Sequence, residues 1–140
     1  MEIKIVSNDQ ELQDAFAVRR EVFIHEQQVP EEEEIDQYEN DSTHFVIYQD
    51  NRPIGAGRFR IVDGLGKVER ICVLNDQRKT GAGKAIMNSI EDYAKKQGLS
   101  TLKLNAQTHA IPFYEGLGYE IISEEFLDAG IPHRAMKKMI

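Results

Sequence analysis

The stretch Arg78-Lys79-Thr80-Gly81-Ala82-Gly83 stands between a predicted strand over residues 67–74 and the most regular predicted helix of the chain. A strand, a glycine-containing loop and a helix form a natural anion site, because the first amides of a helix lack intrahelical acceptors and its dipole favours negative charge. The two glycines carry no side chain, so the backbone can approach a phosphate closely. Arg78, Lys79 and the following Lys84 add positive charge. These residues predict a diphosphate site.

Two common nucleotide-binding motifs are excluded. A Walker loop requires Ser or Thr after its Gly-Lys pair, and Gly83-Lys84 is followed by Ala85. The dinucleotide fingerprint Gly-x-Gly-x-x-Gly fails at its last glycine in both Gly55-Ala56-Gly57 and Gly81-Ala82-Gly83. For the loop alone, a helix start that needs flexible residues remains the alternative.

The rest of the chain predicts a mixed α/β order. The helix after the loop has apolar residues at helical spacing and a glycine, Gly98, where a left-handed C-cap would stand. Before the loop we predict a strand at 3–5, a helix that begins at Asn8 or Asp9 and breaks before Pro30, and a second short turn or helix in the acidic segment. The further predicted elements are an antiparallel meander of strands at 44–48, 54–61 and 67–74, a strand at 101–106, a short helix from Pro112 to Gly118, and strands at 119–123 and 132–140.

The motif Arg78-x-x-Gly81-x-Gly83 resembles the Arg/Gln-x-x-Gly-x-Gly/Ala signature of the Gcn5-related N-acetyltransferase (GNAT) family. About thirty residues on, the segment from Ala110 to Tyr119 resembles the family's Ala-x-x-Phe-Tyr-x-x-x-Gly-Phe/Tyr motif. Within the family the chain resembles the small ElaA/YjcF-like bacterial branch, on the stretches Arg20-Glu21-Val22-Phe23, Glu26-Gln27, Leu104-Asn105-Ala106-Gln107 and Gly130-Ile131-Pro132-His133. It departs at Gln107, where the family often has Asn.

This resemblance implies an α/β (α+β) GNAT fold, with a mixed, mostly antiparallel central sheet of about six to seven strands flanked by about four helices. It implies one domain over residues 1–140 that transfers an acetyl group from acetyl-CoA to a primary amine, by direct attack through a tetrahedral intermediate. A CoA-binding sensor or interaction domain without turnover is the alternative from another class. Transfer of a longer acyl group also stays open.

The resemblance also implies the residues that contact the cofactor. They are Ile71, Cys72, Val73, Arg78, Lys79, Thr80, Gly81, Ala82, Gly83, Lys84, Asn105, Gln107 and Tyr114. Tyr114 corresponds to the family's general acid, which protonates the departing thiolate; its alternative is an aromatic packing role. With ordinary pKa values this proton transfer is uphill by about 2 kcal/mol, so a hydrogen bond to the sulfur matters more than full transfer.

The amine must lose a proton, because a lysine-like amine is neutral in only about one molecule per thousand at pH 7. Glu69 is the first candidate base, and its alternative is an ion pair with Arg58 or Arg70 across the sheet. Glu26 is the second candidate, and His133 a base, a substrate contact or a structural residue. We expect these three on the acceptor side. Cys72 is expected to be a small buried strand residue rather than a nucleophile.

Composition limits the partners. The chain has 140 residues, 41% hydrophobic and 29% charged, as expected for one soluble domain. A net charge of -7 argues against nucleic-acid binding, and no apolar run approaches the ~18 residues of a membrane span. A single cysteine suits a reducing cytoplasm, the histidine spacing predicts no metal site, and a monomer or homodimer is expected. The acidic run Glu31 to Asp36 is either a solvated loop or a negative rim that attracts a cationic amine.

Overall fold

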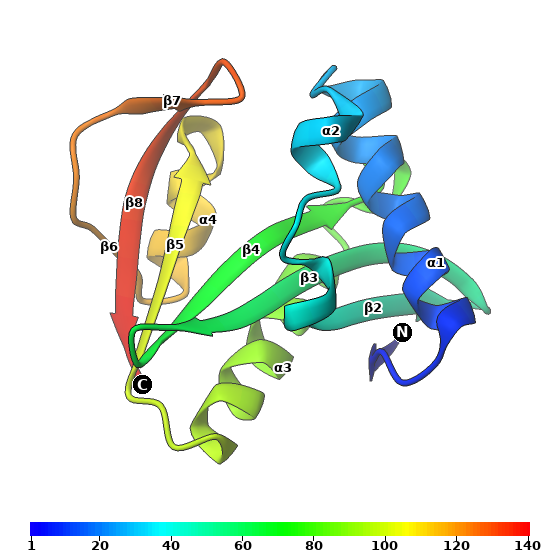
Figure 1. Cartoon of the computed structure of the whole chain (residues 1–140), viewed down its shortest axis with the longest axis horizontal. Coiled ribbons are helices and arrows are strands. Elements are labelled where there is room, and N and C mark those ends of the chain that lie inside the picture. The colour runs from blue at the N-terminus through cyan, green and yellow to red at the C-terminus, as the bar shows by residue number, and fades with distance from the viewer.

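The computed structural model describes residues 1–140 and contains one eight-stranded sheet (Figure 1). The strand order is β1-β2-β3-β4-β5-β8-β6, with β7 paired to β8. Only β4 and β5 run parallel; every other neighbouring pair is antiparallel. The strands are β1 (Glu2–Ile5), β2 (Thr43–Gln49), β3 (Arg52–Val62), β4 (Leu65–Val73), β5 (Thr101–Gln107), β6 (Glu120–Ile121), β7 (Phe126–Asp128) and β8 (Ile131–Met139).

Helices cover both faces of this sheet. They are α1 (Asp9–Arg19), which continues as the π-helix η1 (Arg20–Glu26), α2 (Glu31–Glu34), α3 (Ala82–Lys96) and α4 (Ile111–Gly116), with 3₁₀ turns η2 (Glu39–Asp41), η3 (Asn75–Gln77) and η4 (Thr108–Ala110). Asn8 caps α1, because its side-chain oxygen accepts a hydrogen bond of 2.8 Å from the amide of Glu11. None of these helices is long and apolar enough to cross a membrane.

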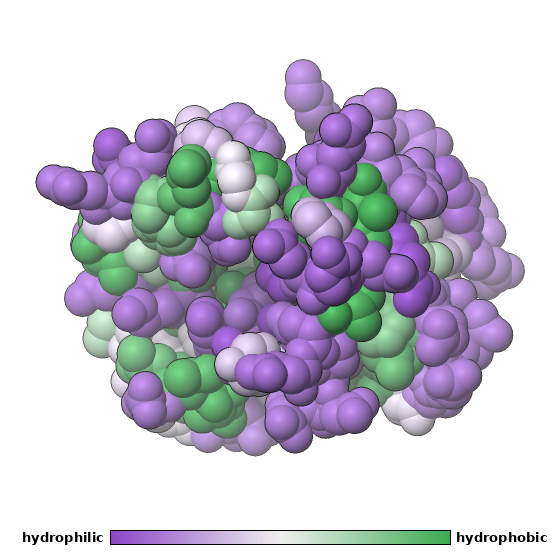
Figure 2. Space-filling view, turned by 45° about the horizontal axis from the view of Figure 1, so that its top comes forward, coloured by the Kyte–Doolittle hydropathy of each residue, from purple (hydrophilic) through white to green (hydrophobic).

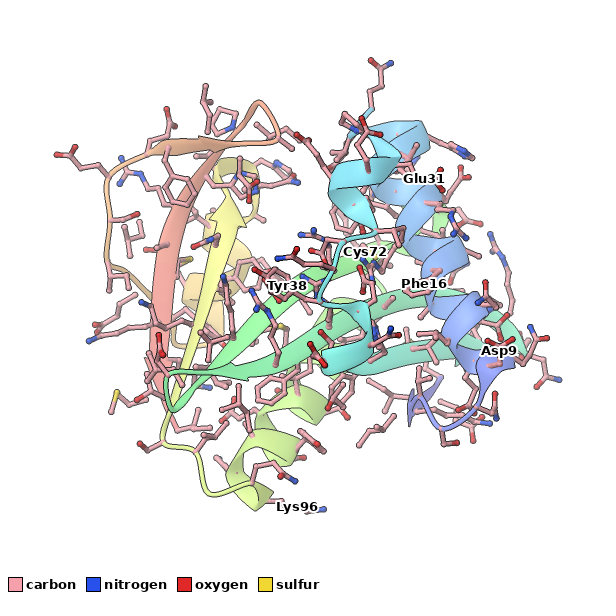
Figure 3. The ribbon with its side chains drawn as sticks, viewed as in Figure 1. Asp9, Phe16, Glu31, Tyr38, Cys72 and Lys96 are labelled. Carbon is pink, nitrogen blue, oxygen red and sulfur yellow. The ribbon has the colours of Figure 1, made fainter.

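Two hydrophobic clusters lie on the two faces of the sheet. The smaller one packs α1 against alternate residues of β2, β3 and β4, and Figure 3 shows Cys72 of β4 at the centre of the molecule, near α1. The larger one packs α3 and α4 against the opposite face. Gly55 and Gly57 on β3 allow α3 to approach, since an added Cβ would lie 2.9 Å from Ile86 at the first position and 3.1 Å from Ile86 at the second.

The parallel strands β4 and β5 separate along their length. Their pairing covers Gly66↔Leu102 to Val68↔Leu104 and then stops. Just beyond, the β3–β4 register shifts between Ala56 and Arg58, and Arg70 adopts a left-handed backbone with φ of 59°. This β-bulge bends β4 away from β5, so that the two strands diverge toward the top of Figure 1. An opening therefore forms between two adjacent strands of one sheet.

The predicted fold class is confirmed. The strand that the sequence did not indicate is β7, whose three residues are too few to show an alternating pattern. The hairpin turn between β3 and β4 consists of Asp63 and Gly64, both with positive φ. The acidic segment forms α2 and η2, in agreement with the short helix or turn that was predicted there.

Candidate active site

A cavity of about 860 Å³ occupies the opening between β4 and β5. This volume is within the range of small-molecule sites, about 300 to 1,000 Å³. Figure 2 shows the surface hollowed between the half of the molecule that contains β5 and β8 and the half that contains α1 and α2. Every residue that the sequence placed in the site lines this cavity, except Thr80 and Ala82. The Thr80 hydroxyl instead donates to the carbonyl of Gln77, and Ala82 is buried under the helix start.

One end of the cavity is the start of α3, which has free hydrogen-bond donors. The N-cap residue Gly81 has φ of 92°, no side chain caps the helix, and its first turn holds no acidic residue. The first main-chain hydrogen bond of the helix runs from Ala85 to the carbonyl of Gly81, so the preceding amides have no acceptor within the helix. Lys79 and Lys84 are exposed beside it and form no ion pair. This donor set fits a diphosphate.

The wall next to this helix start is the separated part of β4. The amide of Leu74 donates to the carbonyl of Ile54 on β3 at 2.8 Å. Successive amides of a strand point to opposite sides, so those of Ile71 and Val73 point away from β3, into the opening left by β5. The side chains of both residues contact the core, while their backbone donors face the cavity.

Arg78 of the loop is held by a carboxylate. Its Nη1 and Nη2 donate to the two oxygens of Glu26, each at 2.7 Å, and its Nε donates to the carbonyl of Val73 at 3.0 Å. Glu26 belongs to η1, so this contact joins the π-helix to the loop across the cavity mouth. The hydrogen bond from Arg78 lowers the pKa of Glu26, which therefore stays charged.

Tyr114 lies on α4 and is almost fully buried at the cavity wall. Its ring packs edge to face on Phe113 and Tyr119, at centroid distances of 5.0 and 5.9 Å. Burial raises the pKa of its phenol well above the usual value, so the hydroxyl keeps its proton. The group can donate a hydrogen bond into the cavity but is a poor full proton donor.

Glu69 lines the acceptor side of the cavity and is surrounded by cations. It contacts Arg60 at 2.7 Å, Arg58 at 3.0 Å and Lys67 at 3.7 Å. Burial alone would raise its pKa, but the hydrogen bond from Arg60 and the charges of all three neighbours lower it. The ion pair with Arg58 that the sequence offered as an alternative is therefore present. A carboxylate with a lowered pKa is a weak base.

The acidic segment is partly an exposed rim and partly paired: Glu31, Glu32 and Glu33 are exposed, whereas Glu34 and Asp36 pair with arginines. Glu34 is buried and pairs with Arg19 at 2.8 Å, and the same arginine donates to Glu39 at 2.8 and 2.9 Å. Together with Glu69 these residues form an arginine–carboxylate network, whose members are Arg19, Arg58, Arg60, Arg70, Glu34, Asp36, Glu39 and Glu69. Its four arginines balance its four carboxylates. The network fastens α2 and η2 to the sheet beside the cavity.

Arg70 gives this network its contact with the bulge. Its Nη2 donates to the carbonyl of Glu33 at 3.0 Å and to Asp36 at 3.2 Å, and its Nε lies 3.1 Å from a carboxylate oxygen of Glu34. The left-handed backbone at Arg70 costs of order 1–3 kcal/mol, and these contacts offset it. This role of Arg70 could not be predicted from the sequence, because a bulge residue has no pattern of its own.

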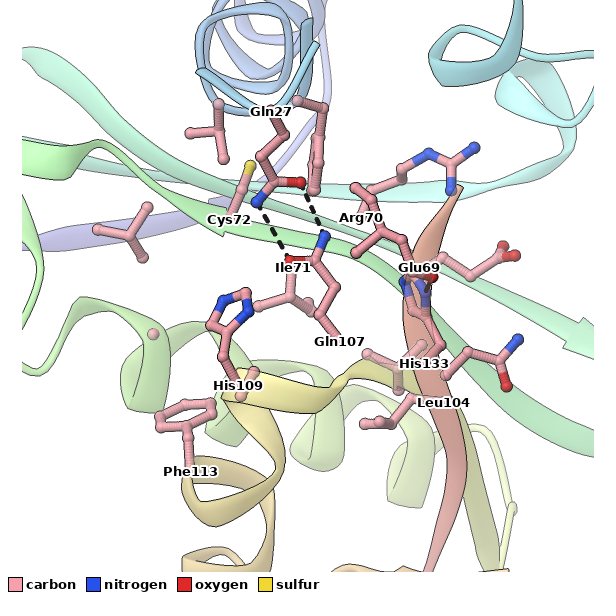
Figure 4. Close-up of a pocket in the computed structure, with 18 of the residues that line it drawn as sticks. Gln27, Glu69, Arg70, Ile71, Cys72, Leu104, Gln107, His109, Phe113 and His133 are labelled. Atoms are coloured by element: carbon pink, nitrogen blue, oxygen red, sulfur yellow. Dashed lines mark hydrogen bonds between the residues drawn. The ribbon is translucent and has the colours of Figure 1, made fainter. Parts of the chain in front are cut away.

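Gln107 on β5 bonds across the cavity to Gln27 of the segment that follows η1. Each amide donates to the other: Gln107 Nε2 to Gln27 Oε1 at 2.7 Å and Gln27 Nε2 to Gln107 Oε1 at 3.2 Å (Figure 4). This glutamine pair spans the opening above Ile71. Gln107, which was predicted from its place in the family motif, therefore faces the cavity. Gln27 was not predicted as a site residue, because its role depends on a contact with a residue 80 positions away in the chain.

His133 lies on β8, directly opposite Gln107 in the antiparallel β5–β8 pair, and is 8% exposed. Its Nδ1 lies 2.6 Å from the carbonyl of Ile131, and its ring stacks on Phe126 of β7 at 6.0 Å. The ring is therefore fixed by two contacts while it lines the cavity. Asn105, two residues before Gln107, lines the cavity as well and is exposed.

Cys72 is not available as a nucleophile. The residue is buried, and its Sγ contacts the carbonyl of Ala56 at 3.9 Å. Burial raises the pKa of the thiol to about 12. The expectation of a small buried strand residue is confirmed.

Comparison with known proteins agrees with this geometry. Residues 5–140 match the family model described as an acetyltransferase (GNAT) domain. The chain is 55% identical to the uncharacterised N-acetyltransferase YjcF of Bacillus subtilis, over 99% of each chain. Its structure is similar to an acyl-CoA N-acyltransferase from Pseudomonas aeruginosa (TM-score 0.85, 25% identity, 98% and 97% of the two chains). It is also similar to Escherichia coli ElaA (TM-score 0.85, 21% identity, 98% of each chain).

Proposed function

Because the chain belongs to the Gcn5-related N-acetyltransferase (GNAT) family and is an acyl-CoA-dependent N-acyltransferase, we propose that it transfers an acetyl group from acetyl-CoA to a primary amine. One observation supports this most: the uncapped start of α3 and the free amides of Ile71 and Val73 face the same cavity. The first set of donors suits a diphosphate, and the second suits an extended amide arm and an acyl oxygen.

In this proposal the cofactor lies along β4 and ends at α3. Gly81, Ala82, Gly83 and Lys84 offer their amides to the diphosphate, and Arg78 and Lys79 supply charge. Thr80 shapes the loop through its hydrogen bond to Gln77. Cys72 contributes backbone only, since its side chain is buried on the opposite face. Asn105 and Gln107 form the facing wall from β5.

Acetyl-CoA supplies the thioester that an amine attacks. The amides of Ile71 and Val73 are placed to hold the acyl oxygen, where negative charge develops. Tyr114 donates a hydrogen bond to the sulfur that departs, and the raised pKa of its phenol favours hydrogen bonding over complete transfer of the proton.

The acceptor enters on the side of Glu69, and Glu26 stands at the mouth. Because the cations around Glu69 lower its pKa, we propose that it orients the ammonium group rather than removing its proton. Glu33 and Asp128 also line the cavity and form no ion pair, so they add negative charge on this side. A small cationic amine is the acceptor class that this wall favours.

The proposal extends to the setting of the enzyme. We propose a single domain over residues 1–140 that acts in the cytoplasm as a monomer or homodimer. A sole cysteine that is buried and unpaired is compatible with a reducing compartment. Sedimentation velocity of the purified chain distinguishes the two assembly states.

Calorimetric titration with acetyl-CoA tests the cofactor site. Lys84→Glu is the decisive variant, because a carboxylate in the first turn of a helix favours the helix dipole while it repels the diphosphate. Reversing one charge at about 4 Å in water changes the interaction by roughly 2 kcal/mol, which predicts about 30-fold weaker binding. Lys137→Glu is the matched control, since it makes the same charge change on exposed β8, outside the cavity. Equal affinities for the two variants would contradict the site.

Thiol release then tests transfer. The wild-type protein with acetyl-CoA and a panel of small diamines, amino sugars and amino acids should release free CoA only when an acceptor is present. Binding of acetyl-CoA without acceptor-dependent release for any primary amine would refute the transfer while leaving the binding site intact.

A further inference from the structure

We propose that His133 is the general base that removes the proton from the acceptor amine, an inference that rests on the proposed function. The reaction requires such a group, because an alkylamine is charged at neutral pH. The two carboxylates that the sequence suggested are both committed to cations: Glu69 to three and Glu26 to Arg78. His133 is a cavity-lining side chain that can accept a proton and has no cation bonded to it.

The hydrogen bond at Nδ1 fixes the tautomer of this imidazole. A carbonyl oxygen can only accept, so at 2.6 Å from Ile131 the Nδ1 atom carries the hydrogen. In the neutral ring the lone pair is then on Nε2. Stacking on Phe126 and burial of more than nine-tenths of the residue hold the ring plane.

The same Nε2 atom is open to the cavity. It forms no hydrogen bond within the protein. His44 Nδ1 is the only fully buried side-chain nitrogen or oxygen of the chain without a partner, so Nε2 of His133 is not sealed in the interior. Since His133 lines the cavity and this atom is not fully buried, the proposal has the lone pair face the space where the acceptor lies.

His133 forms no ion pair with the elements around it. Directly opposite on β5 is the uncharged Gln107. The charged groups that line the cavity on the neighbouring strands β4 and β7 are Lys67, Glu69 and Arg70, which carry ion pairs, and Asp128, which forms none.

The proton balance is simple. The amine nitrogen uses its lone pair to form the C–N bond, the C–S bond breaks, and its electron pair leaves on sulfur. Nε2 of His133 first takes one proton from the ammonium, which frees this lone pair. After the C–N bond has formed, the nitrogen loses a second proton to water, and the sulfur, which accepts a hydrogen bond from Tyr114, gains one proton from water. Exchange with water then returns His133 to its neutral form, so one proton is released in total and no further reactant is required.

The first test is structural and needs no acceptor. Nitrogen-15 NMR of histidine-labelled protein at neutral pH should show His133 as the Nδ1–H tautomer with an unprotonated Nε2. The Ile131 contact predicts this state with or without bound acetyl-CoA. An Nε2–H tautomer would overturn the proposal.

The second test is kinetic and compares His133→Gln with the wild type. Loss of a general base costs about 10²- to 10⁴-fold, and we expect a fall of about 10²-fold in kcat/KM at pH 7, with unchanged affinity for acetyl-CoA by calorimetry. The deficit should shrink about tenfold for each unit of rising pH, because the solution then supplies the neutral amine itself. A constant deficit across pH, as a merely structural residue would give, would overturn the proposal.

Two controls sharpen this comparison. His109→Gln removes another imidazole from the same cavity wall, one that is exposed and makes no hydrogen bond, and should keep the shape of the wild-type pH profile. Methoxyamine is close in size to ethylamine but uncharged at pH 7, so the deficit of His133→Gln should largely disappear with it; persistence of the full deficit counts against a base. If the wild type binds acetyl-CoA but acetylates no amine, the proposed function fails. The NMR tautomer then still shows whether Nε2 of His133 is unprotonated.

Discussion

Replacement of Glu26 by Gln should tighten the binding of CoA. In the structure the carboxylate of Glu26 occupies both terminal nitrogens of Arg78, the guanidinium that we propose as a contact of the diphosphate. The contact must open before Arg78 can turn to a phosphate, and its free energy is subtracted from that of binding. In Glu26→Gln the bidentate ion pair is lost, so this cost falls.

The exposure of the pair sets the size of the effect. The two side chains are 37% and 39% exposed, and exposed ion pairs contribute about 0.2 to 1 kcal/mol. At about 1.4 kcal/mol for each factor of ten, affinity should rise about 1.4- to 5-fold. The geometry of two short hydrogen bonds favours the upper end of this range.

Calorimetric titration with CoA at low and at moderate salt measures this gain. Glu31→Gln is the matched control, because Glu31 pairs with Arg20 at 3.2 Å, is exposed, and lies outside the cavity. It makes the same change in net charge without freeing Arg78, so its affinity should equal that of the wild type. Weaker binding by Glu26→Gln, or an equal gain in both variants, would refute the competition for Arg78.

Three further outcomes are expected. Tyr114→Phe should lower kcat about 10- to 100-fold with little change in CoA affinity, because a hydrogen bond to a charged group contributes about 1.5–3 kcal/mol; steady-state thiol release measures it, and an unchanged kcat would leave Tyr114 a packing residue. The cations around Glu39 lower the pKa of its carboxyl to about 2, so the stability that the charged form contributes is present above pH ~4.5 and is lost as pH falls toward 2. Urea unfolding should show a loss of about 2 kcal/mol in the free energy of unfolding by pH 3. In Glu39→Gln this fall in stability with pH should be smaller, and an equally steep fall would contradict the assignment. Gly57→Ala should destabilise the fold by about 1–3 kcal/mol in the same assay, since its Cβ would lie 2.8 Å from Ile71 of β4 and 3.1 Å from Ile86 of α3, and a neutral effect would show that these side chains can shift.

The sequence predicted those parts of the site that depend on local pattern. The loop around Gly81, the helix that follows it and the tyrosine on α4 are each encoded within a few residues. Their meeting at one cavity followed from the family's order of elements. These are features in which spacing along the chain translates directly into geometry.

Contacts between distant residues escaped the sequence. The run at Glu31 to Asp36 has the composition of a solvated loop, but Arg19, Arg58 and Arg70 pair with two of its five carboxylates, Glu34 and Asp36, from other elements. Whether a carboxylate is free or paired depends on partners that composition cannot locate. For the same reason Glu69 looked suitable as a base until its three neighbouring cations were known.

The burial of Cys72 has a practical consequence for measurement. With a thiol pKa of about 12, only about one molecule in ten thousand is a thiolate at pH 8, and the side chain has almost no access to reagent. Free CoA can therefore be titrated with a disulfide reagent with almost no background from the protein. Because the folded protein reacts so slowly, labelling of Cys72 can report local unfolding. The residue lies on β4 beside the cavity, so its rate of labelling follows transient exposure of that strand. A ligand held along β4 should slow the labelling, which gives a binding signal that requires neither turnover nor a known acceptor.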